Sequence, residues 1–352
     1  MPFVGYYDGE FVESDARAVP IEERGHQFGD GVYEVVRVYG GRPFLLDWHL
    51  ERLENSLKTI AIENPFDRDG WTQLIGEAIR RSGEAEATVY WQVTRGIAPR
   101  NHLFPSAKSV VSLTVRPLAV SASPAKEAPS AALAHAALER ADLEPATGEP
   151  GPVQTADTQQ TSFPPLIALP DERWVNAFVK SINLLPNVIA KEIAHRYHAQ
   201  EAMLVRNGWI TECSGSNVWF VRGGELWTAP ANRYILPGIT RRFVLELAQE
   251  AGIPVHEEAL HLDALQDVEE VFVTSTTQEI QLISSIVTPL DKETALYNLP
   301  ADRPASLVDI GETFKTLWTS PAAPVVGLKL GRLFSETVQR IQQGETPLAV
   351  SK

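Results

Sequence analysis

Apolar and polar positions follow two different periods along the chain. Some segments alternate every second residue, which predicts strands with one buried face, and others place apolar residues every third or fourth position, which predicts helices. Leu50, Leu53, Leu57 and Ile60 recur at helical spacing after Asp47, a residue suited to cap a helix. The predicted elements of this part are strands at 32–39, 42–46, 88–95 and 109–115 and helices at 47–60 and 71–81. They predict an α/β or α+β domain that ends near residue 118.

Regular patterns resume at Trp174 and continue towards the C-terminus. Asn207-Gly208 and Gly223-Gly224 each separate two alternating segments, and such residues favour two-residue hairpin turns because both turn positions need a positive φ. A helix is expected to open at 237–240 and to run to Ala251. The other predicted elements are strands at 201–206, 209–212 and 268–274 and helices at 187–198 and 330–341.

Two segments interrupt these patterns. Residues 119–170 are rich in Ala, Pro, Ser and Thr, with one weak helical patch at 131–143, and residues 288–322 are rich in proline. Long stretches without regular structure are uncommon inside a compact domain. We therefore expect a small N-terminal α/β domain at 1–118, a linker with an insertion at 119–170, and a larger C-terminal domain at 171–352 with a second insertion at 288–322.

Composition narrows the classes of function. A chain of 352 residues exceeds one average domain, so two domains with a site between them are expected. The formal net charge of −14 argues against a surface that binds nucleic acid or anionic membranes, because either needs clustered Lys and Arg. No apolar stretch has the length of a membrane span. The single cysteine excludes an internal disulfide, and the N-terminus lacks the features of a signal peptide, so a cytoplasmic protein without a metal site is expected.

Three separate features could carry chemistry. The run 22–36 joins the tight turn Gly29-Asp30-Gly31 to a strand that contains Tyr33. Lys180 lies among apolar residues, where a charged amine is costly to bury, and Schiff-base formation requires a neutral amine. Glu212 ends a predicted hairpin strand. Taken singly, these features are typical of a buried hairpin, a strand-end lysine and a turn carboxylate.

Together they resemble the signatures of fold-type IV pyridoxal-phosphate enzymes, and most closely those of the D-amino-acid aminotransferases. The run 22–36 resembles the family's N-terminal signature, and Lys-Ser-Ile-Asn-Leu-Leu at 180–185 resembles its cofactor-lysine segment. The resemblance implies that Lys180 forms a Schiff base with pyridoxal phosphate and moves protons as general base and acid. It also implies that Glu212 pairs with the pyridine nitrogen, which keeps the ring protonated as an electron sink. Cys213 departs from the family's usual form beside the glutamate, which leaves the local packing open.

Three places along the chain suit a phosphate group. They are Arg52 on the first long helix, the helix start at 238–240 and the run of hydroxyl side chains at 274–277. Backbone N–H groups at a helix N-terminus attract anions, and a guanidinium adds paired donors. Each signal is weak alone, but their order resembles the family's phosphate site, which assigns Arg52, Ile239, Thr240 and Thr276 to the cofactor. No Gly-x-x-x-x-Gly-Lys-Ser/Thr loop occurs, which disfavours a nucleotide triphosphatase.

Substrate choice is predicted from Arg100 and His102, which lie two positions apart after a predicted strand. An arginine fork with a nearby imidazole suits an α-carboxylate. In D-amino-acid aminotransferases the matching residues bind the substrate carboxylate from the partner subunit, assisted by the tyrosine matching Tyr33. Val35 and Tyr90 are also expected in the substrate pocket. The resemblance thus implies a homodimer that transfers the amino group of a D-amino acid to a 2-oxo acid such as 2-oxoglutarate or pyruvate by a ping-pong mechanism.

Several alternatives stay open. Branched-chain L-amino-acid aminotransferases, (R)-selective amine transaminases and 4-amino-4-deoxychorismate lyases share the residues matching Lys180 and Glu212 and differ in the pocket. Outside the enzymes, the alternative is a non-catalytic binding protein that keeps the fold and makes contacts through its insertions. The resemblance covers roughly residues 4–118 and 171–287, with a weaker match at the last helix, so the two insertions have no assigned function.

Overall fold

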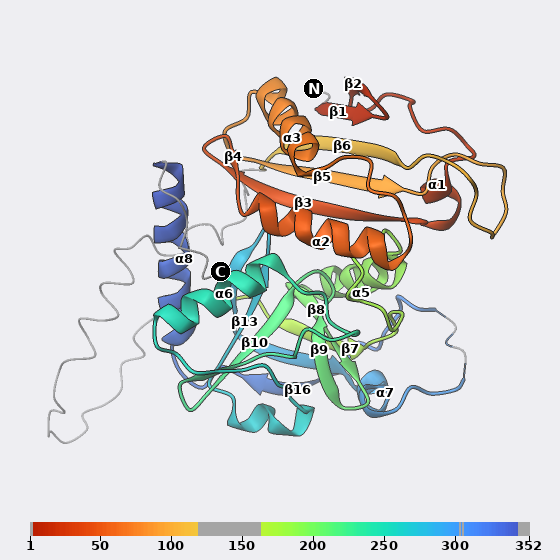
Figure 1. Cartoon of the computed structure of the whole chain (residues 1–352). Helices are drawn as coiled ribbons and strands as arrows, with labels where there is room; N and C mark the ends of the chain where they lie inside the picture. Colours follow the sequence, from red (N-terminus) through yellow and green to blue (C-terminus); the bar gives the residue numbers. More distant parts are fainter. Residues whose placement is uncertain (1–2, 119–162, 303, 305, 344–352) are drawn as a thin grey trace, which may run out of the picture. The chain divides into compact units, whose positions relative to one another are not determined.

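Three β-sheets organise the residues that this computed structural model describes, which are 3–118, 163–302, 304 and 306–343 (Figure 1). One sheet is built from residues before 118, and the other two are built from residues after 163. All three belong to one compact unit. The helical patch predicted at 131–143 lies outside the described residues.

The N-terminal sheet is antiparallel, with the strand order β2-β1-β6-β5-β3-β4. Its strands are β1 (Val4–Tyr7), β2 (Glu10–Glu13), β3 (Gly31–Tyr39), β4 (Arg42–Pro43), β5 (Ala87–Thr94) and β6 (Val110–Pro117). The helices of this part are α1 (Arg24–Phe28), α2 (Leu46–Thr59) and α3 (Arg68–Ser82). Alternation along β3 turns Val32, Val36 and Val38 towards the leucines of α2 and towards Trp71 of α3, so both long helices cover one face of the sheet.

Two sequence predictions fail between β3 and α2. The strand predicted at 42–46 spans only Arg42–Pro43. The Phe44 N–H still donates to the Arg37 carbonyl at 2.8 Å, but the positive φ of 53° at Leu45 then turns the chain into α2. Asp47 does not cap the helix: the preceding cap is Leu45, which has a φ of 53° and an apolar side chain that makes no capping hydrogen bond. Asp47 lies instead in the first turn, where a negative charge is favourable for the helix dipole.

The two C-terminal sheets share a hydrophobic core. One sheet has the order β12-β11-β10-β13-β14, with β10 (Asn217–Arg222), β11 (Glu225–Trp227), β12 (Val255–His256), β13 (Glu270–Ser275) and β14 (Glu279–Ile283). The other has the order β16-β15-β7-β8-β9, with β7 (Leu166–Pro170), β8 (Glu201–Arg206), β9 (Trp209–Cys213), β15 (Ser285–Pro289) and β16 (Phe314–Thr319). The helices are α5 (Leu185–Arg196), α6 (Ile239–Glu250), α7 (Glu293–Tyr297) and α8 (Val326–Gln342), with short 3-10 turns at Leu262–Asp267 and Leu290–Lys292.

Both predicted glycine hairpins are confirmed. Asn207 and Gly208 have φ values of 52° and 81°, and Gly223 and Gly224 have values of 59° and 75°, as a two-residue turn requires. The proline-rich segment 288–322 contains more regular structure than its composition suggests, because it holds α7 and β16, and β16 pairs with β15. The mixture of helices and sheets agrees with the predicted α/β class.

Aromatic side chains join the N-terminal sheet to the C-terminal helices. The ring of Phe44 contacts Phe243 of α6 and Phe334 of α8, with centroids 5.4 and 5.8 Å apart. Nearby, the Tyr39 hydroxyl donates a hydrogen bond to Glu279 of β14 at 2.7 Å. These contacts fix the end of β3 against the C-terminal half.

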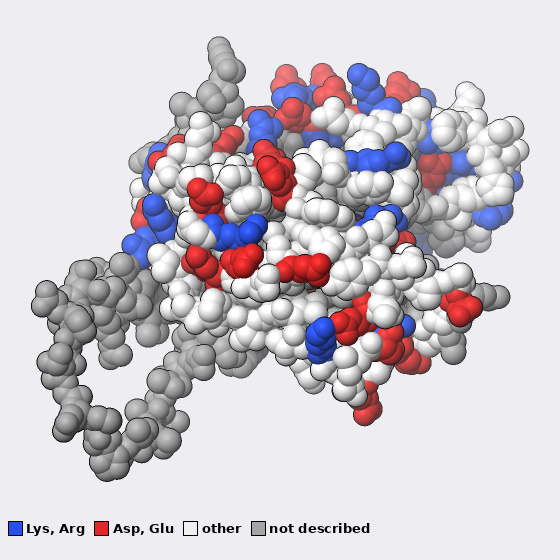
Figure 2. Space-filling model, turned by 90° about the horizontal axis from the view of Figure 1, so that it is seen from below, with Lys and Arg blue, Asp and Glu red and all other residues white. Residues whose placement is uncertain are grey.

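Acidic and basic side chains are interspersed on the face shown in Figure 2, without a continuous basic surface. This distribution agrees with the acidic net charge. No helix within the described ranges is long and apolar enough to span a bilayer.

Candidate active site

A cavity of about 420 Å³ lies where the start of β3, the segment 171–184 and the N-terminus of α6 meet. Most of the residues predicted from the sequence line it, namely Tyr33, Arg52, Lys180, Glu212, Ile239, Thr240 and Thr276. Val35, Tyr90, Arg100 and His102 are not among its lining residues. The structure therefore brings the predicted lysine, the predicted carboxylate and the predicted phosphate contacts to one place.

The segment around Lys180 is attached to the beginning of β3. The Tyr33 N–H donates to the Lys180 carbonyl at 2.9 Å, and the Ile182 N–H donates to the Gly31 carbonyl at 3.1 Å. Val179 is buried in the core of the N-terminal sheet, which anchors the residue next to the lysine. The Lys180 amine lies 4.2 Å from the centre of the Tyr33 ring. Residues 179–182 thus have no regular secondary structure, but their hydrogen bonds to β3 fix the backbone from which Lys180 reaches the cavity.

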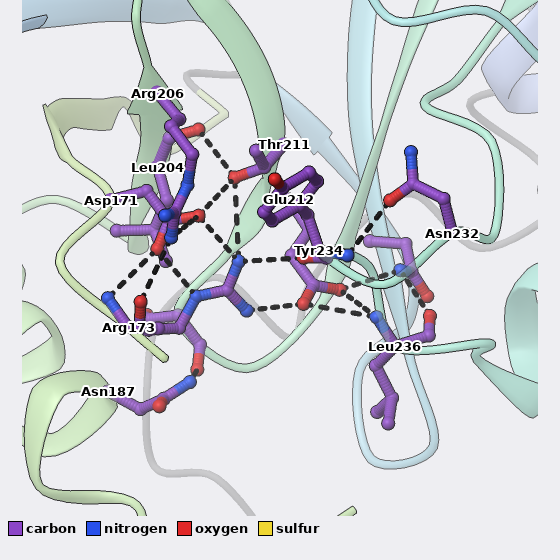
Figure 3. A network of polar contacts seen from close by, with 12 residues as sticks. Asp171, Arg173, Asn187, Leu204, Arg206, Thr211, Glu212, Asn232, Tyr234 and Leu236 are labelled. Atoms are coloured by element: carbon purple, nitrogen blue, oxygen red, sulfur yellow. Dashed lines mark hydrogen bonds and ion pairs between the residues drawn. The ribbon is translucent and has the colours of Figure 1, made fainter. Parts of the chain in front are cut away.

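Glu212 belongs to a buried network of polar side chains (Figure 3). Its carboxylate pairs with the Arg173 guanidinium, accepts a hydrogen bond from the Asn217 amide at 2.9 Å, and accepts the Leu236 N–H at 3.2 Å. Arg173 also pairs with Asp171 at 2.9 Å, so one guanidinium joins two carboxylates. The end of strand β9 therefore carries a carboxylate whose orientation is set by partners on three sides.

Burial and charge act in opposite directions on these carboxyl groups. Burial raises the pKa of Glu212, and the adjacent Arg173 counteracts part of that rise. Burial also acts to raise the pKa of Asp171, but hydrogen bonds and charges from Arg173 and Arg206 lower it overall. Burial raises the pKa of the Cys213 thiol well above its usual value, and Cys213 packs in the shared core of the C-terminal sheets. The unusual cysteine beside Glu212 is thus buried in the core, and it also lines the cavity.

Arg52 is oriented by a second buried carboxylate that sequence reasoning missed. Glu34 accepts two hydrogen bonds from the Arg52 guanidinium at 2.8 Å and lies 2.8 Å from His49 Nδ1. Arg52 also donates to the Pro237 carbonyl at 3.0 Å. Burial acts to raise the pKa of Glu34, but Arg52 and His49 lower it to about 2. The available signal was a glutamate on the apolar face of a predicted strand.

The N-terminus of α6 presents backbone donors to the cavity. Gly238 precedes the helix and provides no side-chain cap, so the first N–H groups of α6 have no capping partner among the described side chains. A Cβ atom at Gly238 would lie 2.1 Å from Oδ1 of Asn217, which explains why only glycine fits beside that amide. Ile239, Thr240 and Thr276 line the same end of the cavity. This arrangement can bind an anion such as a phosphate group.

The loop that carries Arg100 and His102 is exposed. The Arg100 guanidinium lies 4.4 Å from the centre of the Phe28 ring, and the His102 ring lies 5.5 Å from it. On the partly exposed face of the N-terminal sheet, the Tyr90 ring lies 5.7 Å from that of Tyr33. Burial raises the pKa of Tyr90 to about 12, so its hydroxyl stays protonated near neutral pH.

Residues of the cavity fit a phosphorylated pyridine cofactor. The Arg52 guanidinium and the N-terminus of α6 line the same cavity as the ε-amine of Lys180. The buried carboxylate of Glu212 also lines it. In addition, Ser214 lines the cavity, and its buried hydroxyl has no hydrogen-bond partner among the described residues, as is expected of a group that meets a ligand. Arg173 and Asp171 were not predicted from the sequence. The signal that could have indicated them is the run of three charged residues at 171–173, directly after the apolar strand β7.

This fold and this donor set define a fold-type IV pyridoxal-phosphate enzyme. The chain belongs to the amino-transferase class IV family, whose model matches residues 31–147 and 153–286.

Similar proteins include aminotransferases from several bacteria. The chain is 37% identical over 280 residues to a D-alanine aminotransferase of Listeria monocytogenes, with 79% of this chain and 86% of the relative covered. It is 35% identical over 280 residues to the D-alanine aminotransferase of Bacillus licheniformis, with 80% and 87% covered. Among solved structures, a branched-chain aminotransferase from Thermoproteus uzoniensis with norvaline has a TM-score of 0.69 at 20% identity and covers 98% of this chain and 96% of its own. At that identity, the structural likeness shows the fold alone.

Proposed function

We propose that this protein is a D-amino-acid aminotransferase that transfers the amino group of a D-alanine-like substrate to a 2-oxo acid, with pyridoxal phosphate as its cofactor. The observation that carries the proposal is the 37% identity to a D-alanine aminotransferase over most of both chains. The Arg100-x-His102 pair supports the same subgroup. The branched-chain aminotransferases and the putative 4-amino-4-deoxychorismate lyase among the solved structures are 22% identical or less and favour no substrate.

The cavity residues divide the work of binding and proton transfer. Arg52, the N-terminus of α6 and Thr276 would hold the phosphate group of the cofactor. Glu212 would face the pyridine nitrogen, where its negative charge favours a protonated ring. When bound there, pyridoxal phosphate would supply an electron sink and carry the amino group between substrates. The ε-amine of Lys180 would attach the cofactor at rest and would remove and return the proton at the substrate Cα.

A partner subunit would bring the two predicted carboxylate-binding residues to the cavity. Arg100 and His102 are exposed and lie outside the lining of the cavity, so a substrate carboxylate in that cavity would meet them when they are supplied by a partner subunit. Leu103 and Phe104 of the same loop are 75% and 66% exposed, which is consistent with a surface that a partner covers. We therefore propose a homodimer, and a cytoplasmic location stays a prediction.

Covalent attachment of the cofactor tests the role of Lys180. Purified protein should be yellow, and borohydride reduction followed by mass spectrometry should locate a pyridoxyl group at Lys180. The Lys180→Ala variant should lose this adduct. The matched control is Lys58→Ala on the exposed face of α2, which should keep it. A colourless protein that takes up no added pyridoxal phosphate would favour the non-catalytic alternative.

Substrate class is tested with a panel of D-amino acids, L-amino acids and (R)-amines, with pyruvate and 2-oxoglutarate as acceptors. We expect D-alanine to be transaminated and branched-chain L-amino acids to react poorly. Because charged hydrogen bonds contribute about 1.5–3 kcal/mol, Arg100→Leu should raise the KM for D-alanine roughly 10- to 100-fold with a smaller change in kcat. Unchanged kinetics in this variant would remove the argument for D-stereochemistry.

A further inference from the structure

The run 22–30 lies against the loop that carries Arg100 and His102. The Arg24 N–H donates to the Gly96 carbonyl at 2.9 Å, and the Ala98 N–H donates to the Glu22 carbonyl at 3.2 Å. A β-bridge between Glu23 and Ile97 continues this pairing. The start of the loop is thus paired, through one β-bridge and two hydrogen bonds, with a segment for which the proposed function gives no role.

Asp30 connects two arginines that contact the loop at two different residues. Its carboxylate pairs with Arg24 at 2.8 Å and with Arg95 at 2.9 Å. Arg24 donates from Nη1 to the Asn101 carbonyl at 2.6 Å, directly between Arg100 and His102 in sequence. The Arg95 guanidinium lies 3.6 Å from the centre of the Phe104 ring at the far end of the loop. Both arginines are less than 8% exposed, so their geometry is fixed by packing as well as by charge.

The Phe28 ring lies against the side chains of Arg100 and His102 themselves. Arg24 and Arg100 lie 4.8 and 4.4 Å from the centre of its ring, and His102 lies 5.5 Å from it. Phe28 is half-buried, whereas Arg100 and His102 are exposed. A flexible arginine that stacks on an aromatic face loses fewer rotamers when it binds a ligand.

We propose that Phe28 is a positioning residue that, together with the Arg24-Asp30-Arg95 cluster, orders Arg100 and His102 for capture of the substrate carboxylate. The inference rests on the proposed function, because it assigns to Arg100 and His102 the carboxylate of a D-amino acid. It gives the run 22–30 a task distinct from that of Tyr33. Phe28 acts through its neighbours and need not touch the substrate.

A double-mutant cycle between Phe28 and Arg100 tests the proposal. Because an exposed cation–π contact is modest, Phe28→Leu should raise the KM for D-alanine about 3- to 10-fold while kcat changes less than twofold. The same substitution in the Arg100→Leu background should raise the KM by a smaller factor, because His102 is then the only one of the two side chains left for Phe28 to position. The matched control is Phe11→Leu, which removes a ring whose centre lies 4.0 Å from the guanidinium of Arg81, away from the loop. This control should leave the KM unchanged.

Asp30→Asn provides a second variant, since it removes the charge shared by the two arginines and should raise the same KM. An unchanged KM in both Phe28→Leu and Asp30→Asn would overturn the inference. So would an increase of equal size with and without Arg100. If Arg100→Leu alone has no effect on the KM, the carboxylate role in the proposed function fails. If Arg100→Leu has its expected effect but neither Phe28→Leu nor Asp30→Asn changes the KM, only the positioning role fails.

Discussion

Replacement of Glu34 by glutamine tests how much a buried carboxylate stabilises the part of the structure where Arg52 meets the cavity. Glu34 is fully buried, and its two oxygens accept hydrogen bonds from Arg52 and contact His49, all at 2.8 Å. Glutamine keeps the shape of the side chain but loses its charge and presents an amide to one of these partners. The variant therefore leaves the Arg52 guanidinium buried without a counterion.

The magnitude follows from the lowered pKa of this carboxyl group. A shift from 4.5 to about 2 corresponds to roughly 3 kcal/mol of stability at pH 7, at about 1.4 kcal/mol per pH unit. Because the folded-state pKa of Glu34 lies below the unfolded one, this stability is present above about pH 4.5 and is lost as the pH falls through about 2. The difference between wild type and Glu34→Gln should accordingly shrink to roughly half near pH 3.

Urea denaturation followed by tryptophan fluorescence, between pH 7 and pH 3, measures this difference. The control is Glu77→Gln: hydrogen bonds from Arg80 and Arg81 lower the pKa of Glu77 to about 2 as well, but this pair is exposed on α3. Solvent screening should make the control nearly silent. If both variants lose the same stability, or if the loss in Glu34→Gln does not depend on pH, burial is not the reason for the contribution of Glu34.

Two further substitutions test other contacts. Arg173→Met leaves Glu212 buried without its cation and leaves Asp171 with Arg206 alone. It should lower the free energy of unfolding by about 3–5 kcal/mol and weaken cofactor uptake, measured by urea denaturation and by absorbance titration with pyridoxal phosphate. Arg206→Met removes a 24% exposed partner that does not reach Glu212 and should cost less than about 1 kcal/mol, so equal losses would refute the special role of Arg173. Tyr39→Phe removes the hydrogen bond to Glu279 and should lower stability by about 1–2 kcal/mol, and an unchanged denaturation midpoint would show that this contact does not join the two halves.

Local signals predicted much of the fold. The hairpins at Asn207-Gly208 and at Gly223-Gly224 could be located because positive φ values restrict the choice of residue. The end of β4 could not, because the alternation continues to Leu46 and gives no sign of the positive φ at Leu45 that turns the chain into α2. Composition alone also concealed β16, a strand that forms only through pairing with β15.

The candidate site divides in the same way. Lys180 and Glu212 could be predicted as cofactor residues because their neighbours in sequence resemble known segments. The pairing of Arg173 with Glu212 joins residues 39 apart, and no local pattern encodes such a contact. Likewise, the sequence marks Glu34 as an oddity on an apolar face, but its partner Arg52 becomes apparent only when α2 lies on the sheet.

The backbone of Lys180 depends on residues from a remote part of the chain, which has a consequence for folding. Its N–H donates to the hydroxyl of Ser56, 124 positions earlier, at 3.3 Å, and its carbonyl accepts from Tyr33. Contacts across such long loops carry a large closure entropy and form slowly. In refolding, cofactor uptake should therefore lag behind the recovery of helical circular dichroism. A newly synthesised chain would bind pyridoxal phosphate only at the end of folding. The bound cofactor would then stabilise the folded protein against unfolding by mass action.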